Sequence, residues 1–113
     1  MANKVTPTPF FETKYKRLSK KFPSLDAELE QLEKELKDNP EFGEPLGANL
    51  YKVRLASKDK GKGKSGGFRV ITYLMQEQND LCEIFLITIY DKSEKSTIAK
   101  STLIKLVRSI FND

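Results

Sequence analysis

Four cationic side chains in the second half of the sequence are spaced so that they could surround one phosphate group. Lys52 and Arg54 alternate with apolar residues in LYKVRLA, Arg69 lies at the start of FRVITYLM, and Lys92 follows LCEIFLITIY. Arginine forks bind phosphate oxygens in pairs, and a lysine crowded by other cations has a lowered pKa, so that it can accept a proton. This set of residues predicts phosphoryl-transfer chemistry that needs no histidine.

A simpler interpretation of the same residues stays open, because outward-facing cations are common on a half-solvated sheet. The cations of neighbouring strands converge only if Arg69 lies on the same side of the sheet as Lys52 and Arg54. The pattern alone does not decide between a phosphate site and a solvated face.

The composition excludes several other kinds of site. The chain has no histidine and one cysteine, Cys82, which excludes histidine-dependent catalysis, thiolate zinc clusters and an intramolecular disulfide. Cys82 lies in an apolar run and is expected to be a small core residue. We expect no cofactor and no metal.

The length and the hydropathy pattern predict one globular domain over residues 1–113 with a single hydrophobic core. No apolar run approaches the roughly 18 residues that cross a membrane. The start, MANKVTPTPF, also lacks the apolar segment of a secretory signal. We therefore expect a cytoplasmic protein that does not bind membranes.

The net charge of +4 is unevenly distributed along the chain. Residues 1–22 hold six basic residues and one acidic residue, whereas residues 23–47 hold two basic and eight acidic ones. Residues 48–72 again hold seven basic residues and one acidic residue. This alternation indicates a basic face that attracts phosphate groups, although a set of solvated charged faces would give the same pattern.

Two amphipathic helices are predicted within the first 39 residues. Thr8 and Pro9 have the chemistry of a helix start, and Pro23 ends that helix. Ser24 can cap the second helix, which ends at Asn39, before a proline. In each helix the apolar residues recur at i, i+4, i+7 and i+11, namely Phe11, Tyr15, Leu18 and Phe22, then Leu25, Leu29, Leu32 and Leu36.

Three strands are predicted after these helices. In LYKVRLA the apolar residues Tyr51, Val53 and Leu55 share one face, and Lys52 and Arg54 share the other. The runs FRVITYLM and LCEIFLITIY are rich in β-branched and aromatic residues and are separated by the polar turn QEQND. An antiparallel meander is therefore expected.

A basic loop and a last helix complete the predicted fold. The loop SKDKGKGKSGG, with lysines at positions 58, 60, 62 and 64, is predicted to be disordered without a partner and to become ordered only against RNA or an acidic segment of a partner protein. Ser96 and Thr97 can cap a helix with the stripe Ile98, Leu103, Leu106 and Ile110, which ends near Phe111. The predicted fold class is α+β, with two N-terminal helices packed on a small antiparallel sheet and a C-terminal helix.

The string GKGKSGGFRVITYL, followed by IFLITIYDKSEK, resembles the sheet region of the RelE/HigB-type toxins of bacterial toxin–antitoxin modules. With the paired helices and LYKVRLA, the resemblance covers about residues 10–110. It implies a toxin that cuts messenger RNA in the ribosomal decoding site, an endoribonuclease that inhibits translation without a metal. The implied partners are a cognate antitoxin, the ribosome and messenger RNA.

The resemblance also implies a set of catalytic roles. The family's sheet cations fall on Lys52, Arg54 and Arg69, and its late arginine falls on Lys92. The implied reaction is attack of a ribose 2′-hydroxyl on the adjacent phosphate to give a cyclic phosphate. Lys52 would act as base, Arg54 and Arg69 would stabilise the developing charge, and Lys92 would protonate the leaving oxygen. A family tyrosine near the last helix is replaced by Ile98.

Further residues are predicted to bind RNA. They are the loop lysines Lys58, Lys60, Lys62 and Lys64 and the tyrosines Tyr73 and Tyr90. Either tyrosine could substitute for the one missing at Ile98, and Tyr73 is equally well explained as a core residue. The cationic face is also expected to bind an acidic antitoxin segment.

Two other functions share this fold and stay open. ParE-type relatives bind DNA gyrase and do not cut RNA, so the fold alone does not identify a nuclease. A degenerate module that only binds an antitoxin is the other alternative, and Ile98 keeps it open. The cations at Lys52, Arg54, Arg69 and Lys92 favour the nuclease.

Overall fold

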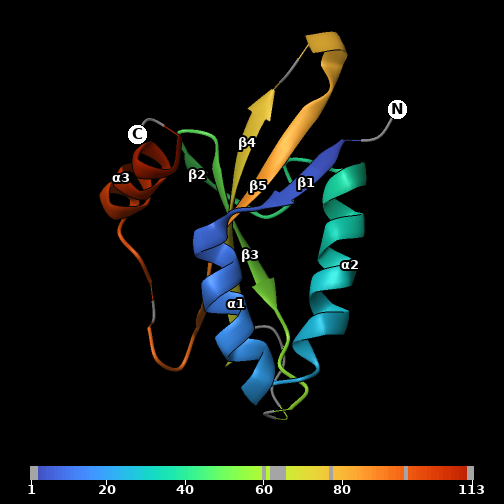
Figure 1. Cartoon of the computed structure of the whole chain (residues 1–113), viewed down its shortest axis with the longest axis vertical. Coiled ribbons are helices and arrows are strands. Elements are labelled where there is room, and N and C mark those ends of the chain that lie inside the picture. The colour runs from blue at the N-terminus through green and yellow to red at the C-terminus, as the bar shows by residue number, and fades with distance from the viewer. Residues whose placement is uncertain (1–2, 60, 62–65, 77, 96, 112–113) are drawn as a thin grey trace.

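A five-stranded sheet with helices on both faces makes up the described part of the chain, residues 3–59, 61, 66–76, 78–95 and 97–111 of a computed structural model (Figure 1). The helices are α1 (Pro9–Lys21), α2 (Leu25–Asp38) and α3 (Lys100–Phe111). The strands lie in the order β1 (Lys4–Pro7), β5 (Cys82–Asp91), β4 (Phe68–Gln76), β3 (Leu50–Leu55) and β2 (Glu44–Gly47). The predicted α+β fold class is confirmed.

Helix α1 begins as its sequence predicts. The Thr8 hydroxyl accepts a hydrogen bond from the Phe11 N–H at 3.2 Å and donates one to the Leu86 carbonyl at 2.9 Å. Pro9 follows in the first turn, where a helix does not need its missing N–H. Thr8 therefore caps the helix and also fastens its start to strand β5.

Helix α2 begins differently from the prediction. Ser24 occupies the N-cap position, but its hydroxyl caps no helix N–H. Instead the hydroxyl and the N–H of Ser24 both donate to the Asp59 carboxylate, at 2.6 Å and 2.9 Å. These two hydrogen bonds lower the pKa of Asp59. The prediction of a side-chain cap was wrong, because Ser24 has helical backbone angles, φ −66° and ψ −12°, and not the extended conformation from which a hydroxyl accepts from the first turn.

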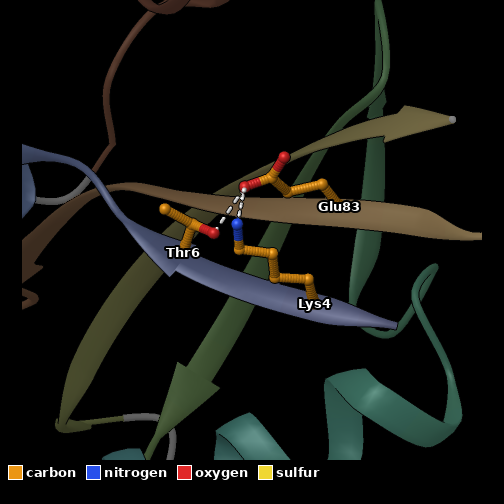
Figure 2. Close-up of polar contacts among 3 residues, drawn as sticks. All are labelled: Lys4, Thr6 and Glu83. Atoms are coloured by element: carbon orange, nitrogen blue, oxygen red, sulfur yellow. Dashed lines mark hydrogen bonds and ion pairs between the residues drawn. The ribbon is translucent and has the colours of Figure 1, made fainter. Parts of the chain in front are cut away.

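Strands β3, β4 and β5 form the predicted antiparallel meander, and the structure adds a strand at each edge. Strand β1 pairs in parallel with β5, and β2 pairs antiparallel with β3. Each added strand has four residues and contains a proline, so neither shows an alternation that a sequence pattern could reveal. Glu83 fastens β1, since it accepts from the Thr6 hydroxyl at 2.6 Å and lies 3.7 Å from the Lys4 ammonium (Figure 2).

The two faces of the sheet carry separate hydrophobic clusters. Helices α1 and α2 lie side by side over one face, and α3 lies apart from them (Figure 1). The cluster under α1 and α2 is the larger one and includes Phe11, Leu18, Leu25, Leu32, Leu36, Val53, Leu55, Phe68, Val70, Ile84, Leu86 and Ile89. The cluster under α3 has as its buried members Leu50, Ile71, Ile87, Tyr90 and Leu103.

Helix α3 begins later than its sequence predicts. Residues 97–99 are not helical, and the Ala99 carbonyl accepts from the N–H groups of Thr102 and Leu103. The predicted cap at Thr97 is therefore wrong, and Ser96 lies outside the described residues. Ile98 packs against the cluster under α3 from the non-helical connecting segment. Within the described residues no helix has the length and apolar character required to cross a membrane.

Replacing Thr8 tests the double role of its hydroxyl. Thr8 is buried, so Thr8→Ala removes a helix cap and a buried hydrogen bond and should lower the free energy of unfolding by about 1–2 kcal/mol. Thr8→Ser keeps the hydroxyl and should retain most of the stability. Urea denaturation monitored by circular dichroism measures both variants. Equal losses for alanine and serine would show that the hydroxyl contributes nothing.

Candidate functional site

The sheet register brings the predicted cations onto one face. Arg54 on β3 lies directly opposite Arg69 on β4, and Arg69 lies opposite Tyr90 on β5. Lys52 lies opposite Ile71, two residues further along the same two strands. Directly paired residues share a face of a sheet. Lys52, Arg54 and Arg69 therefore lie on one side, the side opposite α1 and α2.

A β-bulge places Tyr90 in this row. Ile71 pairs with Thr88 and Thr72 pairs with Leu86, so Ile87 is an extra residue in β5. Leu86 packs under α1 and α2, and strict alternation would turn residue 90 to that same face. The extra residue shifts the alternation by one, and Tyr90 packs with the cluster under α3 instead.

Arg69 is the most buried of these cations. It is 4% exposed, and its guanidinium Nη1 donates to the Phe68 carbonyl at 3.2 Å. Burial, and then the charge of Arg54, lower the pKa of Arg69, whereas Tyr90 raises it. Like charges directly opposite in a sheet repel each other. An anion bound beside Arg54 and Arg69 would relieve that repulsion.

Lys52 has an acidic partner that the sequence analysis did not identify. The Lys52 ammonium lies 3.7 Å from the Glu44 carboxylate, and the two residues are paired across β2 and β3. The hairpin turn that joins these strands contains Ala48 and Asn49, both with positive φ. The residue pair Ala-Asn between EPLG and LYKVRL was the available signal, because asparagine tolerates this conformation. Lys52 is thus held in an ion pair and not only crowded by cations.

A shallow depression of about 380 Å³ lies over this ion pair. Gly43 forms part of its wall at a φ of +110°, and a Cβ there would lie 2.7 Å from the Lys52 carbonyl oxygen. Only glycine allows the two backbones to approach this closely. The depression is lined by Phe42, Gly43, Glu44, Lys52, Val53 and Arg54.

The two candidate tyrosines have different surroundings. Tyr90 is 8% exposed, and burial raises its pKa, while Arg69 lowers it and Glu44 raises it. Its phenol therefore interacts electrostatically with the cation row and with Glu44. Tyr73 lies under α3, where its ring centroid is 5.5 Å from that of Phe111. The structure brings Tyr90, rather than Tyr73, together with the cations.

The remaining predicted site residues lie at the ends of the strands. The Lys92 N–H donates to the Gly67 carbonyl at 3.0 Å, so that Lys92 lies just beyond the paired ends of β4 and β5. Lys58 is exposed, next to the anchored Asp59. Lys60, Lys62 and Lys64 lie outside the described residues. In the same loop Ser57 is buried, Asp59 accepts from Ser24 and the Gly67 carbonyl accepts from Lys92, so the prediction of disorder was wrong for these residues. Cys82 packs against the cluster under α1 and α2, which confirms its predicted core role.

Comparison with known proteins identifies the family. A family model described as the RelE toxin of the RelE / RelB toxin-antitoxin system matches residues 9–110. Among solved structures, a double arginine-to-alanine mutant of the E. coli toxin RelE in the free state is similar, with a TM-score of 0.61 and 15% identity. The match covers 98% of this chain and 100% of that one, and at this identity it shows the fold alone. Because the family match spans most of the chain, this protein belongs to the RelE family of toxins from toxin–antitoxin systems.

Proposed function

We propose that this toxin is a ribosome-dependent endoribonuclease that cleaves messenger RNA and so inhibits translation. The observation that supports this most directly is the cross-strand pair of Arg54 and Arg69, in which a buried arginine faces a second arginine. Two guanidinium groups held on neighbouring strands can bind one anion together. A phosphate of RNA has the charge and the two-oxygen geometry that arginines bind best.

The proposed reaction transfers the phosphate within the RNA chain. The 2′-oxygen attacks the adjacent phosphorus, the 5′-oxygen leaves, and a 2′,3′-cyclic phosphate and a 5′-hydroxyl result. Negative charge builds up on the phosphate oxygens during attack. Arg54 and Arg69 are fixed on neighbouring strands beside these oxygens, and burial of Arg69 makes its interaction with the charge stronger than in water.

Lys52 is the proposed base, with Glu44 as its positioning residue. In the proposed reaction the Lys52 amine accepts the proton of the 2′-hydroxyl, and the Glu44 carboxylate 3.7 Å away holds the amine in place. No metal takes part in the proposed reaction.

The remaining proposed contacts with the RNA lie near the paired ends of β4 and β5. Lys92 lies next to Gly67, two residues from Arg69 in sequence, and is the proposed donor to the leaving 5′-oxygen. Tyr90 is the proposed replacement for the tyrosine missing at Ile98, because it lies opposite Arg69. The loop lysines, of which Lys58 is described, would contact the RNA backbone with a strong dependence on salt.

Exposed Arg54 allows the proposed site to be tested without disturbing the core. Arg54→Ala should reduce cleavage of messenger RNA on programmed ribosomes by about 100-fold, because one charge-stabilising donor is lost. The melting temperature should stay close to that of the wild type, since the side chain is exposed. Primer extension maps the cut sites, and the exposed Arg108→Ala on α3 serves as the matched control.

Three outcomes bear on this assignment. Unchanged cleavage by Arg54→Ala would refute the role of the cation row. Equal losses of cleavage in Arg54→Ala and Arg108→Ala would show that cleavage depends only on the general positive charge of the protein. Wild-type protein that leaves RNA intact but inhibits supercoiling by gyrase would establish the ParE-like alternative.

A double-mutant cycle tests whether Glu44 acts through Lys52. We expect Glu44→Gln to slow single-turnover cleavage by about 10-fold and Lys52→Ala by about 100-fold, as for loss of a stabilising partner and of a general base. The double variant should be no slower than Lys52→Ala alone, because without the amine Glu44 has nothing to position. Losses that multiply would instead show that Glu44 acts independently of Lys52.

A further inference from the structure

A second concave region lies between α1, the end of β5 and α3. It is a groove of about 310 Å³ and is distinct from the depression over Lys52 and Glu44. Tyr90 lines this groove and also pairs with Arg69 in the cation row, so the groove and the row adjoin at this residue. Its lining includes Phe10, Lys14, Arg17, Lys95, Ile98 and Leu106.

The groove has an apolar floor and an exposed aromatic ring at its edge. Ile98, Leu103 and Leu106 belong to the cluster under α3 and form the floor. Phe10 is 39% exposed and is the one large apolar side chain with an exposed surface in the described part of the chain. A single exposed phenylalanine is ordinary, but here it extends a concave apolar surface, which an aliphatic side chain would fill.

The charged residues of the groove favour an acidic partner. Lys14 and Arg17 come from α1 and Lys95 from the segment after β5, and among the described residues none of the three is in an ion pair. The Lys14 ammonium lies 5.3 Å from the centroid of the Phe10 ring, so this ring and its cation form one unit at the edge. Carboxylates that reach these three residues would be bound without displacing an internal partner.

The same surface is less suited to RNA. Two carboxylates, those of Asp91 and Glu94, also line the groove, and the Asp91 carboxylate is fixed by hydrogen bonds from the N–H and hydroxyl of Ser93. An RNA backbone carries a charge at every nucleotide and would be repelled by them. A peptide can carry its carboxylates only where the cations lie and an apolar side chain where the floor lies.

We propose that this groove binds an acidic segment of the antitoxin that carries an aliphatic or aromatic side chain. The apolar side chain packs beside Phe10 on the floor, and the flanking carboxylates pair with Lys14, Arg17 and Lys95. The proposal rests on the toxin role of the protein and not on its ribonuclease activity. A segment bound here lies against Tyr90, next to the face that is proposed to bind RNA phosphate.

The test measures binding of the purified antitoxin that is encoded beside this toxin, by isothermal titration calorimetry at two salt concentrations. The double variant Lys14→Glu with Arg17→Glu should weaken binding at least about 10-fold and reduce its salt dependence, because favourable charge pairs become repulsive. Phe10→Ala should weaken binding several-fold and leave the salt dependence unchanged, because an apolar contact is lost. All altered side chains except that of Lys14, which is half-buried, are exposed, and circular dichroism checks the fold.

The matched control is Lys34→Glu with Lys37→Glu on α2, which changes the net charge by the same amount at exposed positions. Equal weakening by the two double variants would overturn the proposal, since net charge alone would explain binding. Wild-type affinity in both groove variants would also overturn it. The proposal would likewise be overturned if the groove variants lost only the binding of a single-stranded RNA oligonucleotide, because the groove would then be an RNA-binding surface. Absence of RNA cleavage by the wild type would refute the nuclease and leave this binding result intact.

Discussion

Strand β4 is hydrogen-bonded to a neighbour along both edges, and the position of the functional side chains depends on its register. Phe68 and Val70 belong to the cluster under α1 and α2, while Arg69 and Ile71 lie on the other face. A slip of one residue would exchange these faces and place a guanidinium in the larger apolar core. Burying an unpaired charge there would cost several kcal/mol. The apolar residues that stabilise the fold thereby also hold the cations in their common row.

Two cations face each other directly on the side of the sheet away from α1 and α2. Arg54 and Arg69 repel each other across β3 and β4, and Arg69 is nearly inaccessible to water. Glu44 compensates on one side, where its carboxylate pairs with Lys52 and interacts with Tyr90. The larger cluster beneath α1 and α2 contains most of the fully buried apolar side chains. The cation row therefore lies on the face with the smaller cluster.

The parts of the fold that the sequence predicts are those with a strong local pattern. Both N-terminal helices have regular apolar stripes, and the Thr8–Pro9 start of the first has a specific hydrogen-bonding chemistry. The alternation in LYKVRLA likewise identifies the face on which Lys52 and Arg54 lie. The parts that it does not predict depend on partners distant in the chain, as Ser24 does on Asp59 across 35 positions.

The least predictable residues of the site are Glu44 and Tyr90. Glu44 lies in a short edge strand that takes its conformation from pairing with β3, so no pattern of its own indicates a strand. Tyr90 reaches the cation face because of the bulge at Ile87, and the two polar residues Glu83 and Thr88 are too few in the run LCEIFLITIY to reveal the change in alternation. The common face of Lys52 and Arg54 was predictable from the alternation in LYKVRLA, whereas the side on which Arg69 lies depends on the register between β3 and β4.

RNA and an acidic antitoxin would be attracted by the same positive potential, so charge alone does not distinguish them. The cation row favours phosphate, because its two arginines are fixed on neighbouring strands and one of them is buried. The groove between α1 and α3 offers an apolar floor that a phosphate backbone does not use. Tyr90 lines the groove and is paired with Arg69 of the row, so the two surfaces adjoin at this residue. Two anionic partners can thus be recognised by different chemistry at neighbouring positions, and a partner held in the groove would be close enough to the row to exclude RNA by its own charge and volume.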